Sequence, residues 1–246
     1  MSQAKASDLP PVGLVIAGAG TGERLGAKIP KAFVMLDGET LLVRSTRPFL
    51  QLRPLVEIVA VVPDGWEAAA AETFDAAGIS SIVRAVVPGA AVRQESVARG
   101  LAALGPKPEI VLVHDAARPM ASAELVERVA RAAAEGGAAI PGIRPIDTIK
   151  EVSGDDVSAT PDRANLRAIQ TPQGFRRELL ERAYAAAAVE GTIATDDSAL
   201  VESLGETVRV VAGERTNMKV TVAEDLAMCE ALLAEGAPAP VKGVRR

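Results

Sequence analysis

The sequence predicts a doubly wound α/β fold, in which helices cover both faces of a mainly parallel sheet. Short apolar runs alternate along the chain with longer amphipathic segments. Strands that are buried on both faces of a parallel sheet are hydrophobic throughout, rather than at every second residue. The composition supports this fold, because 48% of the residues are hydrophobic and only 2% are aromatic, so that alanine and branched aliphatic residues must fill the core.

The apolar runs mark the strands, and the segments between them mark the helices. Strands are predicted at 12–17, 56–62, 82–87, 110–113 and 138–143. Helices are predicted at 40–52, 66–77, 92–104 and 123–135. Ligands bind such sheets beyond the carboxyl ends of the strands. The main polar motifs follow the first and fourth predicted strands, so we expect the chemistry to lie on one rim of the sheet.

Residues 144–171 interrupt this pattern with Asp, Gly and Pro residues between short β-like pieces at 148–152 and 166–169. A loop of this length inside a compact domain is usually functional or an interaction arm. The regular pattern resumes at 176–189, 197–203, 207–211 and 223–233. We therefore expect a single domain over residues 1–236 with an arm at 144–171, followed by a flexible tail at 237–246, which contains two prolines and has a basic end.

Charge and cysteine content restrict the partners and the compartment. A net charge of −5 gives no overall attraction to nucleic acid, so an anionic substrate must be bound by local basic groups. The single cysteine, Cys229, cannot form an internal disulfide, which is typical of a reducing compartment. The first eleven residues contain no apolar segment, and no apolar run is long enough to span a bilayer. The sequence thus predicts a cytoplasmic protein that binds neither nucleic acid nor membrane.

The motif after the first strand predicts a polyphosphate site. Residues 19–26 read Ala-Gly-Thr-Gly-Glu-Arg-Leu-Gly, and Pro30-Lys31 follow. Glycines bring backbone N–H groups close to phosphate oxygens, and Arg24 and Lys31 supply positive charge. A Walker loop would need Lys-Ser/Thr directly after its last glycine. A dinucleotide fingerprint would need a glycine at position 23, which is Glu, so a nicotinamide-dependent oxidoreductase is the alternative that fits this motif less well.

The fourth predicted strand is followed by a second motif, His-Asp-Ala-Ala-Arg-Pro at 114–119. Asp115 could hold a metal ion or a hydroxyl, and Arg118 could clamp a phosphate. A buried Asp–Arg pair that orders a loop would explain the same two residues. His114 is expected to be a hydrogen-bonded structural residue rather than a base, because it is the only histidine and cannot belong to a histidine cluster.

Other polar clusters have structural explanations when each is taken alone. Thr195 or Asp196 could cap a helix, Lys219 could be a solvated charge, and Arg163 could form a salt bridge within the arm. Taken together, however, several cations of an acidic protein stand at or near strand ends. This concentration of positive charge is suited to a site where two phosphorylated ligands meet, and it comprises Arg24, Lys31, Arg118, Arg163 and Lys219.

Seven motifs follow one another along the chain. They are the glycine motif at 19–26 with Pro30-Lys31, Arg93-Gln94-Glu95-Ser96-Val97, the motif at 114–119, Asp147-Thr148-Ile149-Lys150, Thr171-Pro172-Gln173, Thr195-Asp196-Asp197 and Asn217-Met218-Lys219-Val220-Thr221. In this order they resemble the motifs of the 2-C-methyl-D-erythritol 4-phosphate cytidylyltransferases, over about residues 12–233. The order of the motifs is specific to the family group, whereas a single one is not.

The resemblance implies a Rossmann-like nucleotidyltransferase that uses Mg²⁺ to join CTP and methylerythritol phosphate, in the non-mevalonate pathway of isoprenoid biosynthesis. By position, it implies that Arg24 and Lys31 stabilise the transition state, while Arg163 and Lys219 place the sugar phosphate. It implies a nucleotide side made of Ala19, Gly20, Thr21, Gly22, Ser96 and Ala116. It implies a sugar-phosphate side made of Asp115, Arg118, Thr148, Thr171 and Thr195. No metal ligand is firmly assigned, since Mg²⁺ would be held mainly by the CTP phosphates, with Asp115 as a candidate.

The resemblance also implies a homodimer in which the protruding β-arm, with Thr148 and Arg163, completes the active site of the neighbour. The chain departs from the family pattern at Ala90-Ala91-Val92, where many members carry an acidic or polar residue, and at Arg144-Pro145-Ile146, where Pro-Val-Thr is usual. Ribitol 5-phosphate cytidylyltransferases share most of these motifs. A non-catalytic nucleotide-binding module is a further alternative, although such a module would have no need of the retained Arg24, Lys31 and Lys219.

Overall fold

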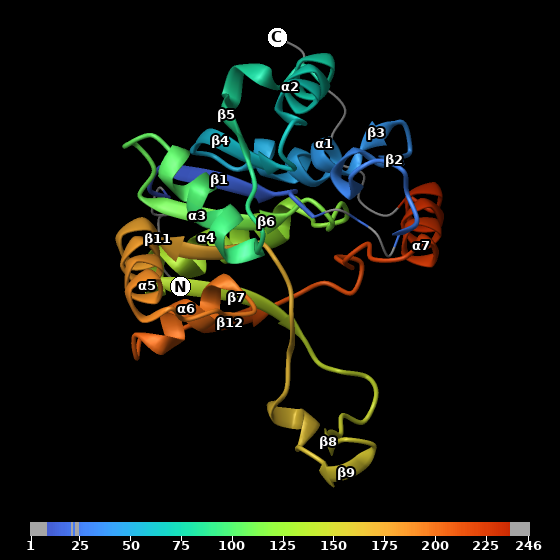
Figure 1. The fold of residues 1–246 in the computed structure, drawn as a ribbon, viewed down its shortest axis with the longest axis vertical. Helices are drawn as coiled ribbons and strands as arrows, with labels where there is room; N and C mark the ends of the chain where they lie inside the picture. The colour runs from blue at the N-terminus through green and yellow to red at the C-terminus, as the bar shows by residue number, and fades with distance from the viewer. Residues whose placement is uncertain (1–8, 21, 23–24, 237–246) are drawn as a thin grey trace, which may run out of the picture.

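The computed structural model describes residues 9–20, 22 and 25–236, which form an eight-stranded sheet with helices on both faces (Figure 1). Seven strands are paired in the order β10-β7-β11-β6-β1-β4-β5. β10 and β11 pair with opposite ends of β7 along one of its edges, and β12 pairs along the other edge. The strands are β1 (Val12–Ala17), β4 (Leu55–Val62), β5 (Val83–Pro88), β6 (Ile110–Asp115), β7 (Ala138–Ile143), β10 (Ala168–Ile169), β11 (Gln173–Arg176) and β12 (Arg209–Ala212).

Most of the strand pairs within this eight-stranded sheet are parallel, as the sequence predicts. β1 runs parallel to β4 and β6, β4 to β5, and β7 to β12. In the described part of this sheet, the antiparallel pairs all involve β10 or β11. In the register of β1 with β6, Ala17 lies opposite Asp115. The carboxyl ends of these two central strands therefore open on the same rim.

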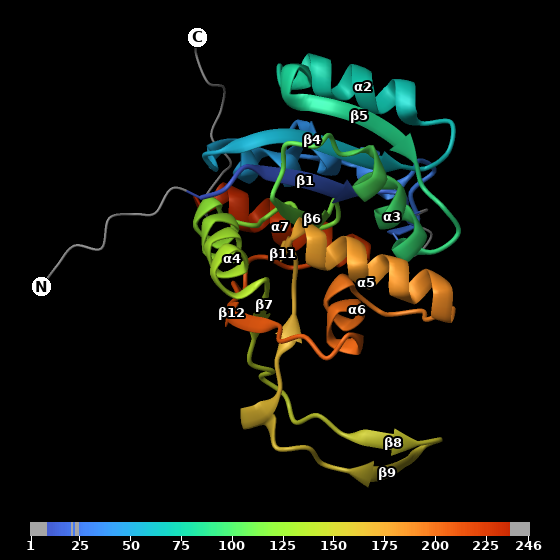
Figure 2. The same cartoon turned by 90° about the vertical axis from the view of Figure 1, so that its left-hand side faces the viewer.

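Alternate residues of the central strands pack on opposite faces of the sheet. Leu14 and Ile16 belong to a core formed with α1 (Leu41–Thr46), α2 (Glu67–Ala76) and α4 (Ala123–Gly136). Val15 belongs to a second core, formed with α3 (Arg93–Ala103), α5 (Arg177–Glu190) and α6 (Asp197–Ser203) (Figure 2). Both faces of β1 are thus fully covered, which explains why its sequence is hydrophobic throughout.

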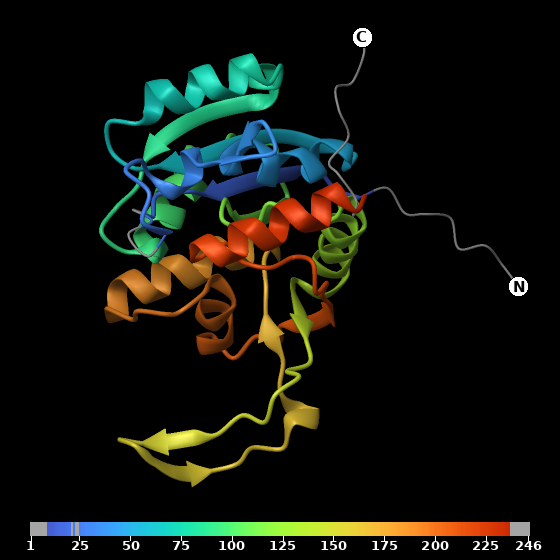
Figure 3. The same ribbon diagram turned by 90° about the vertical axis from the view of Figure 1, so that its right-hand side faces the viewer.

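A third, smaller core lies under the last helix, α7 (Ala223–Ala234), which crosses the molecule in Figure 3. Its buried Cys229 packs with Leu36 and Leu41, next to the short hairpin of β2 (Met35–Leu36) and β3 (Glu39–Thr40). Within the described part of the chain, no helix is both long and apolar enough to cross a membrane.

The helix predicted at 40–52 is shorter in the structure. α1 ends at Thr46, and a 3-10 helix, η3, continues from Arg47 to Gln51. Pro48 at the start of η3 lacks the N–H that an α-helical hydrogen bond would need. The fourth predicted strand is longer than expected, because β6 continues to Asp115. His114 and Asp115 are therefore part of the strand itself rather than of the loop that follows.

The predicted excursion from the sheet is an arm that extends away from the body of the molecule (Figures 1 and 2). It carries an exposed hairpin of β8 (Glu151–Ser153) and β9 (Asp156–Ala159), which forms a separate two-stranded sheet. The β-like piece expected at 148–152 overlaps β8 only in part, and β9 is not predicted because Asp156, its first residue, interrupts the pattern together with Gly154 and Asp155. The arm returns to the body at β10.

Candidate active site

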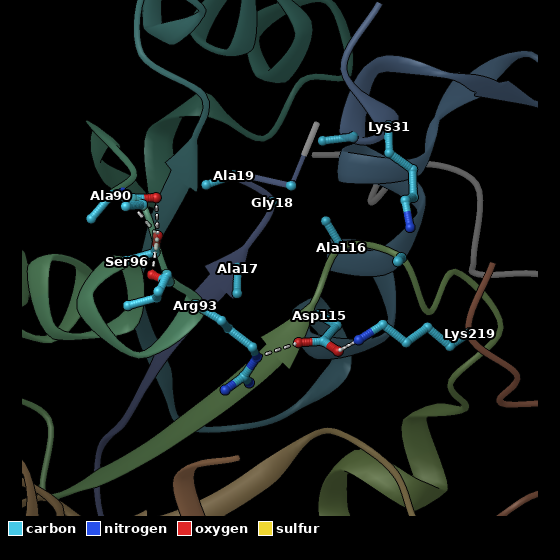
Figure 4. Close-up of a pocket in the computed structure, with 15 residues that line it drawn as sticks. Ala17, Gly18, Ala19, Lys31, Ala90, Arg93, Ser96, Asp115, Ala116 and Lys219 are labelled. Atoms are coloured by element: carbon cyan, nitrogen blue, oxygen red, sulfur yellow. Dashed lines mark hydrogen bonds and ion pairs between the residues drawn. The ribbon is translucent and has the colours of Figure 1, made fainter. Parts of the chain in front are cut away.

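A pocket of about 260 Å³ opens at the rim of the sheet beyond β1 and β6 (Figure 4). Segments far apart in the sequence meet there, as expected for a doubly wound sheet. Charged groups on its wall come from Lys31, Arg93, Asp115 and Lys219. The remaining lining residues are small or apolar except for Ser96, and they are Ala17, Gly18, Ala19, Gly20, Ala32, Ala90, Ala91, Val92, Ala116 and Ala117.

The glycine loop leaves β1 through a tight passage. A Cβ on Gly18 would lie 3.2 Å from the carbonyl oxygen of Val61 and 3.3 Å from the Cβ atoms of Ala32 and Ala116. Gly20, by contrast, faces open space, so its backbone is accessible to a ligand. Gly22 has a φ of +78°, which favours glycine. Thr21, Glu23 and Arg24 lie outside the described residues.

Lys31 stands at the start of a 3-10 helix, η2 (Lys31–Phe33), behind the glycine loop. Its Nζ donates a hydrogen bond to the carbonyl oxygen of Val220 at 3.1 Å. Val220 is next to Lys219, so the loop after β1 and the segment before α7 meet at the pocket. Figure 4 shows Lys31 and Lys219 on the same side of it, opposite Ala90 and Ser96.

Asp115, at the end of β6, is the central carboxylate of the pocket. Its Oδ1 accepts a hydrogen bond from Arg93 Nε at 3.1 Å, and its Oδ2 accepts one from Lys219 Nζ at 2.7 Å. Burial alone would raise the pKa of Asp115, but Arg93, Lys219 and, to a lesser extent, Arg118 together hold it well below its usual range. Asp115 is therefore ionised and fixed by two cations.

One interpretation of the sequence makes Arg118 the partner of Asp115 in a buried Asp–Arg pair. Such a pair does form at this strand end, but its arginine is Arg93. Asp115 pairs with Arg93, whereas Arg118 donates hydrogen bonds to the carbonyl oxygens of Asn217 at 2.8 Å and Ile169 at 3.4 Å. The interpretation of Asp115 and Arg118 as partners is thus wrong. Sequence proximity was misleading, because the turn after β6 directs Arg118 toward the segments before β11 and α7.

Arg93, the first residue of α3, has no role that the sequence predicts, although it belongs to one of the seven motifs. Its guanidinium contacts Asp115 and also donates from Nη2 to Asp197 Oδ2 at 2.8 Å. Burial would lower the pKa of Arg93, but Asp197 and Asp115 hold it above its usual range. The signal that could have identified it was its place at the start of a helix facing the pocket rim, three residues before Ser96.

Ser96 forms hydrogen bonds to the backbone of the loop at 90–92, which lies on the side of the pocket opposite Lys31 and Lys219. Its Oγ accepts a hydrogen bond from the N–H of Ala90 at 2.9 Å and donates one to the carbonyl oxygen of Val92 at 3.1 Å. The side chains at 90–92 are all apolar. Polar contacts between this wall and a ligand must therefore come from the backbone or from Ser96.

His114 and Thr171 lie under the pocket rather than on its wall. The Nε2 of buried His114 contacts the carbonyl oxygen of Arg118 at 3.1 Å, so it must donate. Its Nδ1 then accepts from the Thr171 hydroxyl at 3.0 Å, and that hydroxyl in turn accepts from the N–H of Asp115 at 3.1 Å. Burial lowers the pKa of His114 to about 4. His114 is thus neutral and hydrogen-bonded, as expected.

Thr148, Arg163 and Thr195 lie away from the pocket of this chain, and Gly22, Arg118 and Thr171 are also absent from its wall. Thr148 and Arg163 are exposed on the arm, where Arg163 donates to the carbonyl oxygen of Ile146 at 3.1 Å. Within the described residues no ion pair of Arg163 occurs. Thr195 is exposed, and its neighbour Asp196 caps α6 by accepting from the N–H of Ala199.

The family model of 2-C-methyl-D-erythritol 4-phosphate cytidylyltransferase matches residues 12–235. The chain belongs to this family. Similar relatives include a 2-C-methyl-D-erythritol 4-phosphate cytidylyltransferase of Symbiobacterium thermophilum, 42% identical over 92% of this chain and 94% of the relative. The bifunctional enzyme IspD/IspF of Clavibacter michiganensis is 46% identical over 95% of this chain, which spans only 57% of that relative.

Solved structures of cytidylyltransferases agree with the fold. The 2-C-methyl-D-erythritol 4-phosphate cytidylyltransferase of Thermus thermophilus has a TM-score of 0.75 and 36% identity, over 93% of this chain and all of that one (100%). The 4-diphosphocytidyl-2C-methyl-D-erythritol synthase of Anaerococcus prevotii has a TM-score of 0.81 and 31% identity, over 92% and 96%. The resemblance seen in the motifs is thus confirmed for the family and the fold.

The cytidylyltransferase site has no protein cage for a metal ion among the described residues, since no three His, Cys, Asp or Glu side chains converge there. Asp115 is the carboxylate that lines the pocket. Mg²⁺ usually binds through one or two carboxylates together with substrate phosphates. The donor set therefore fits an ion held mainly by a nucleotide, and it does not fit an ion held by the protein alone.

Proposed function

We propose that this protein transfers CMP from CTP to 2-C-methyl-D-erythritol 4-phosphate, giving 4-CDP-2-C-methyl-D-erythritol and pyrophosphate for isoprenoid biosynthesis. The observation that carries the proposal is the convergence of Lys31, Arg93 and Lys219 beside a glycine loop, in a member of the cytidylyltransferase family. Two anionic substrates must approach each other in this reaction, and the net charge of −5 means that only local cations can draw them together.

The reaction needs charge stabilisation more than acid–base catalysis. A phosphate oxygen of the acceptor forms a new bond to the α-phosphorus of CTP while the bond to pyrophosphate breaks. A phosphate oxygen is already ionised near neutral pH, so no strong general base is required. His114 is neutral and both of its ring nitrogens are hydrogen-bonded. Positioning and countercharge should therefore supply most of the rate enhancement.

The pocket divides these tasks between its two sides. We assign Lys31, together with Arg24, to the charge that develops on the α-phosphorus and on the leaving pyrophosphate. Lys219 and Asp115 serve the acceptor substrate, since the lysine side chain is 45% exposed beside a carboxylate that can accept hydrogen bonds from hydroxyl groups. Nucleotide contacts are assigned to the glycine loop, to the opposite wall and to the residue that follows β6, and comprise Ala19, Gly20, Thr21, Gly22, Ser96 and Ala116.

Mg²⁺ is proposed as the cofactor, held mainly by the CTP phosphates, with Asp115 as the candidate protein ligand. When bound, the ion would neutralise phosphate charge and polarise the α-phosphorus. Asp115 is ionised in the ligand-free protein because of Arg93 and Lys219, so it needs no proton removed before it can act as a ligand or accept a hydrogen bond.

The arm supports the proposal of a homodimer with shared active sites. It extends away from the body (Figure 1), and Thr148 and Arg163 are exposed on it. Apolar side chains are also exposed there, namely Ile146, Ile149, Val152 and Val157. These are the features of a segment that another subunit covers. We also propose a cytoplasmic location, which is supported by the buried thiol of Cys229.

Pyrophosphate release tests the assignment directly. Each of CTP, UTP, ATP and GTP should be combined with methylerythritol phosphate and with ribitol 5-phosphate, in the presence and absence of Mg²⁺. We expect turnover with CTP and methylerythritol phosphate, and its loss in a Lys31→Ala protein purified in the same way excludes a contaminant. Preference for ribitol 5-phosphate would assign the chain to the related enzyme, and no turnover with any pair would favour a non-catalytic module.

A further inference from the structure

A series of buried hydrogen bonds leads from the pocket to a residue that does not line it. Arg93 donates from Nε to Asp115 Oδ1 and from Nη2 to Asp197 Oδ2. Asp197, the first residue of α6, is only 1% exposed. Two nitrogens of the guanidinium are thus held by two carboxylates, of which Asp115 lines the pocket and Asp197 does not.

The second oxygen of Asp197 is held as well. Its Oδ1 accepts a hydrogen bond of 2.5 Å from the hydroxyl of Tyr184, in the middle of α5. Burial, and then the charge of Asp197, raises the pKa of Tyr184 above its usual range, so the hydroxyl remains a donor. Tyr184 therefore fixes the plane of the Asp197 carboxylate, which in turn fixes Arg93.

The neighbour of Arg93 anchors the same segment independently. Gln94 donates from Nε2 to the carbonyl oxygen of Thr192 at 3.0 Å, and its Oε1 accepts from the N–H of Ala194 at 2.9 Å. The start of α3 is thus attached at two places to the chain that leads into α6. Arg93 and Gln94 thus each connect the start of α3, at the pocket wall, to the segment that carries Asp197.

We propose that Tyr184 and Asp197 are positioning residues that set the affinity of the pocket for the sugar-phosphate substrate. They hold the Arg93 guanidinium, and Arg93 orients Asp115 so that the other carboxylate oxygen faces Lys219. A planar guanidinium whose Nε and Nη2 each donate to a carboxylate cannot turn without breaking a charged hydrogen bond. The inference rests on the proposed function, in which Asp115 and Lys219 serve the acceptor.

Steady-state kinetics of Tyr184→Phe, Asp197→Asn and the double variant test this inference. We expect the KM for methylerythritol phosphate to rise about tenfold in each single variant, as when the partner that orients a binding residue is removed. The KM for CTP and kcat should stay within about twofold. The double variant should resemble Asp197→Asn alone, because Tyr184 acts through Asp197. Arg182→Ala is the matched control, since it removes an exposed ion pair of α5 with Glu206.

Each outcome decides the inference. An unchanged KM for the sugar phosphate in folded Tyr184→Phe overturns it. A lower Tm accompanied by a lower kcat and higher KM values for both CTP and the sugar phosphate also overturns it, because the substitution would then act through stability. Multiplying effects in the double variant would also overturn it, because the two residues would then act separately. If Asp197→Asn does not fold, Tyr184→Phe, which keeps the ring, decides alone. A wild-type protein that releases no pyrophosphate refutes the proposed function, and this inference with it.

Discussion

Lys219 Nζ lies 2.7 Å from Asp115 Oδ2, yet the lysine side chain is 45% exposed and the carboxylate only 10%. Asp115 is therefore the buried member of the pair, and Lys219 is the member that solvent and ligands can reach. Because an ammonium group has three donors, Lys219 can donate hydrogen bonds to an anionic ligand while it keeps its hydrogen bond to Asp115. This arrangement places a cation at the pocket mouth before any substrate binds.

The first prediction concerns the cations beside the glycine loop. Lys31→Ala and Arg24→Ala should each lower kcat by about 10²–10³, by analogy with the loss of one preorganised donor to the transition state, while Tm changes little. Lys28→Ala is the matched control, because Lys28 is exposed and does not line the pocket. Near wild-type turnover of Lys31→Ala in a pyrophosphate assay would show that this cation does not serve the transition state.

The second prediction concerns the pH dependence of stability. The pKa of His114 is about 4 in the folded protein, against an ordinary value of 6.5. The unfolded chain therefore binds a proton between these values while the folded protein does not, so stability falls as the pH falls from 6.5 to 4. The full difference corresponds to about 3 kcal/mol.

Urea unfolding of the wild type and of His114→Gln at pH 7, 5.5 and 4.5 measures this contribution. Carboxylates titrate in the same range, so the difference between the two proteins is the informative quantity. We expect the gap in unfolding free energy to narrow as the pH falls, because only the wild type pays for protonation of His114. A constant gap would mean that His114 titrates normally in the folded protein.

The third prediction contrasts two glycines at the pocket. A Cβ on Gly89 would lie 2.2 Å from the Cβ of Ala19, whereas a Cβ on Gly20 would meet no atom within 4 Å. Gly89→Ala should lower the unfolding free energy by about 1–3 kcal/mol. Gly20→Ala should leave stability within about 0.5 kcal/mol and raise the KM for CTP. Ala19→Gly should restore stability to Gly89→Ala, and no restoration would contradict the steric explanation.

The fourth prediction tests whether the arm serves a neighbouring subunit. When inactive Lys31→Ala and Arg163→Ala chains exchange subunits, one site of each mixed dimer carries both changes and the other carries none. With half of the dimers mixed, about a quarter of normal activity should return. A mixture of Lys31→Ala and Lys219→Ala should stay inactive, because both residues belong to the body. Failure of the first mixture, with exchange confirmed by mass, would assign Arg163 to its own subunit.

The sequence predicted the central strands well, because full burial on two faces leaves a continuous apolar run such as Val12 to Ala17. It overestimated the helix after Thr40, where Pro48 changes the hydrogen bonding. It missed β9, since an exposed hairpin in an arm has no apolar pattern to reveal it. It also missed β11, which is buried between β6 and β7 but contains Phe175 as its one large apolar residue. Strands with a continuous apolar run are thus more predictable than strands without one.

The pocket was predicted less completely than the sheet. Lys31, Asp115 and Lys219 do meet there, because the ends of parallel strands share a rim. The role of Arg93 was missed and the partner of Asp115 was mistaken, because Arg93 lies 22 positions along the chain from Asp115 and 104 positions from Asp197. Spacing along the sequence carries no information about such pairs. Thr171 was expected in the pocket but supports it from below.

The apolar wall at Ala90-Ala91-Val92 bears on the design of inhibitors. A compound that forms hydrogen bonds to the backbone of this wall would depend on groups that every amino acid except proline provides. Substitution of a side chain would leave those groups in place, and the close contact of Gly89 with Ala19 limits how far the loop can shift. Resistance through a single point mutation at this wall should therefore be difficult to acquire without loss of stability.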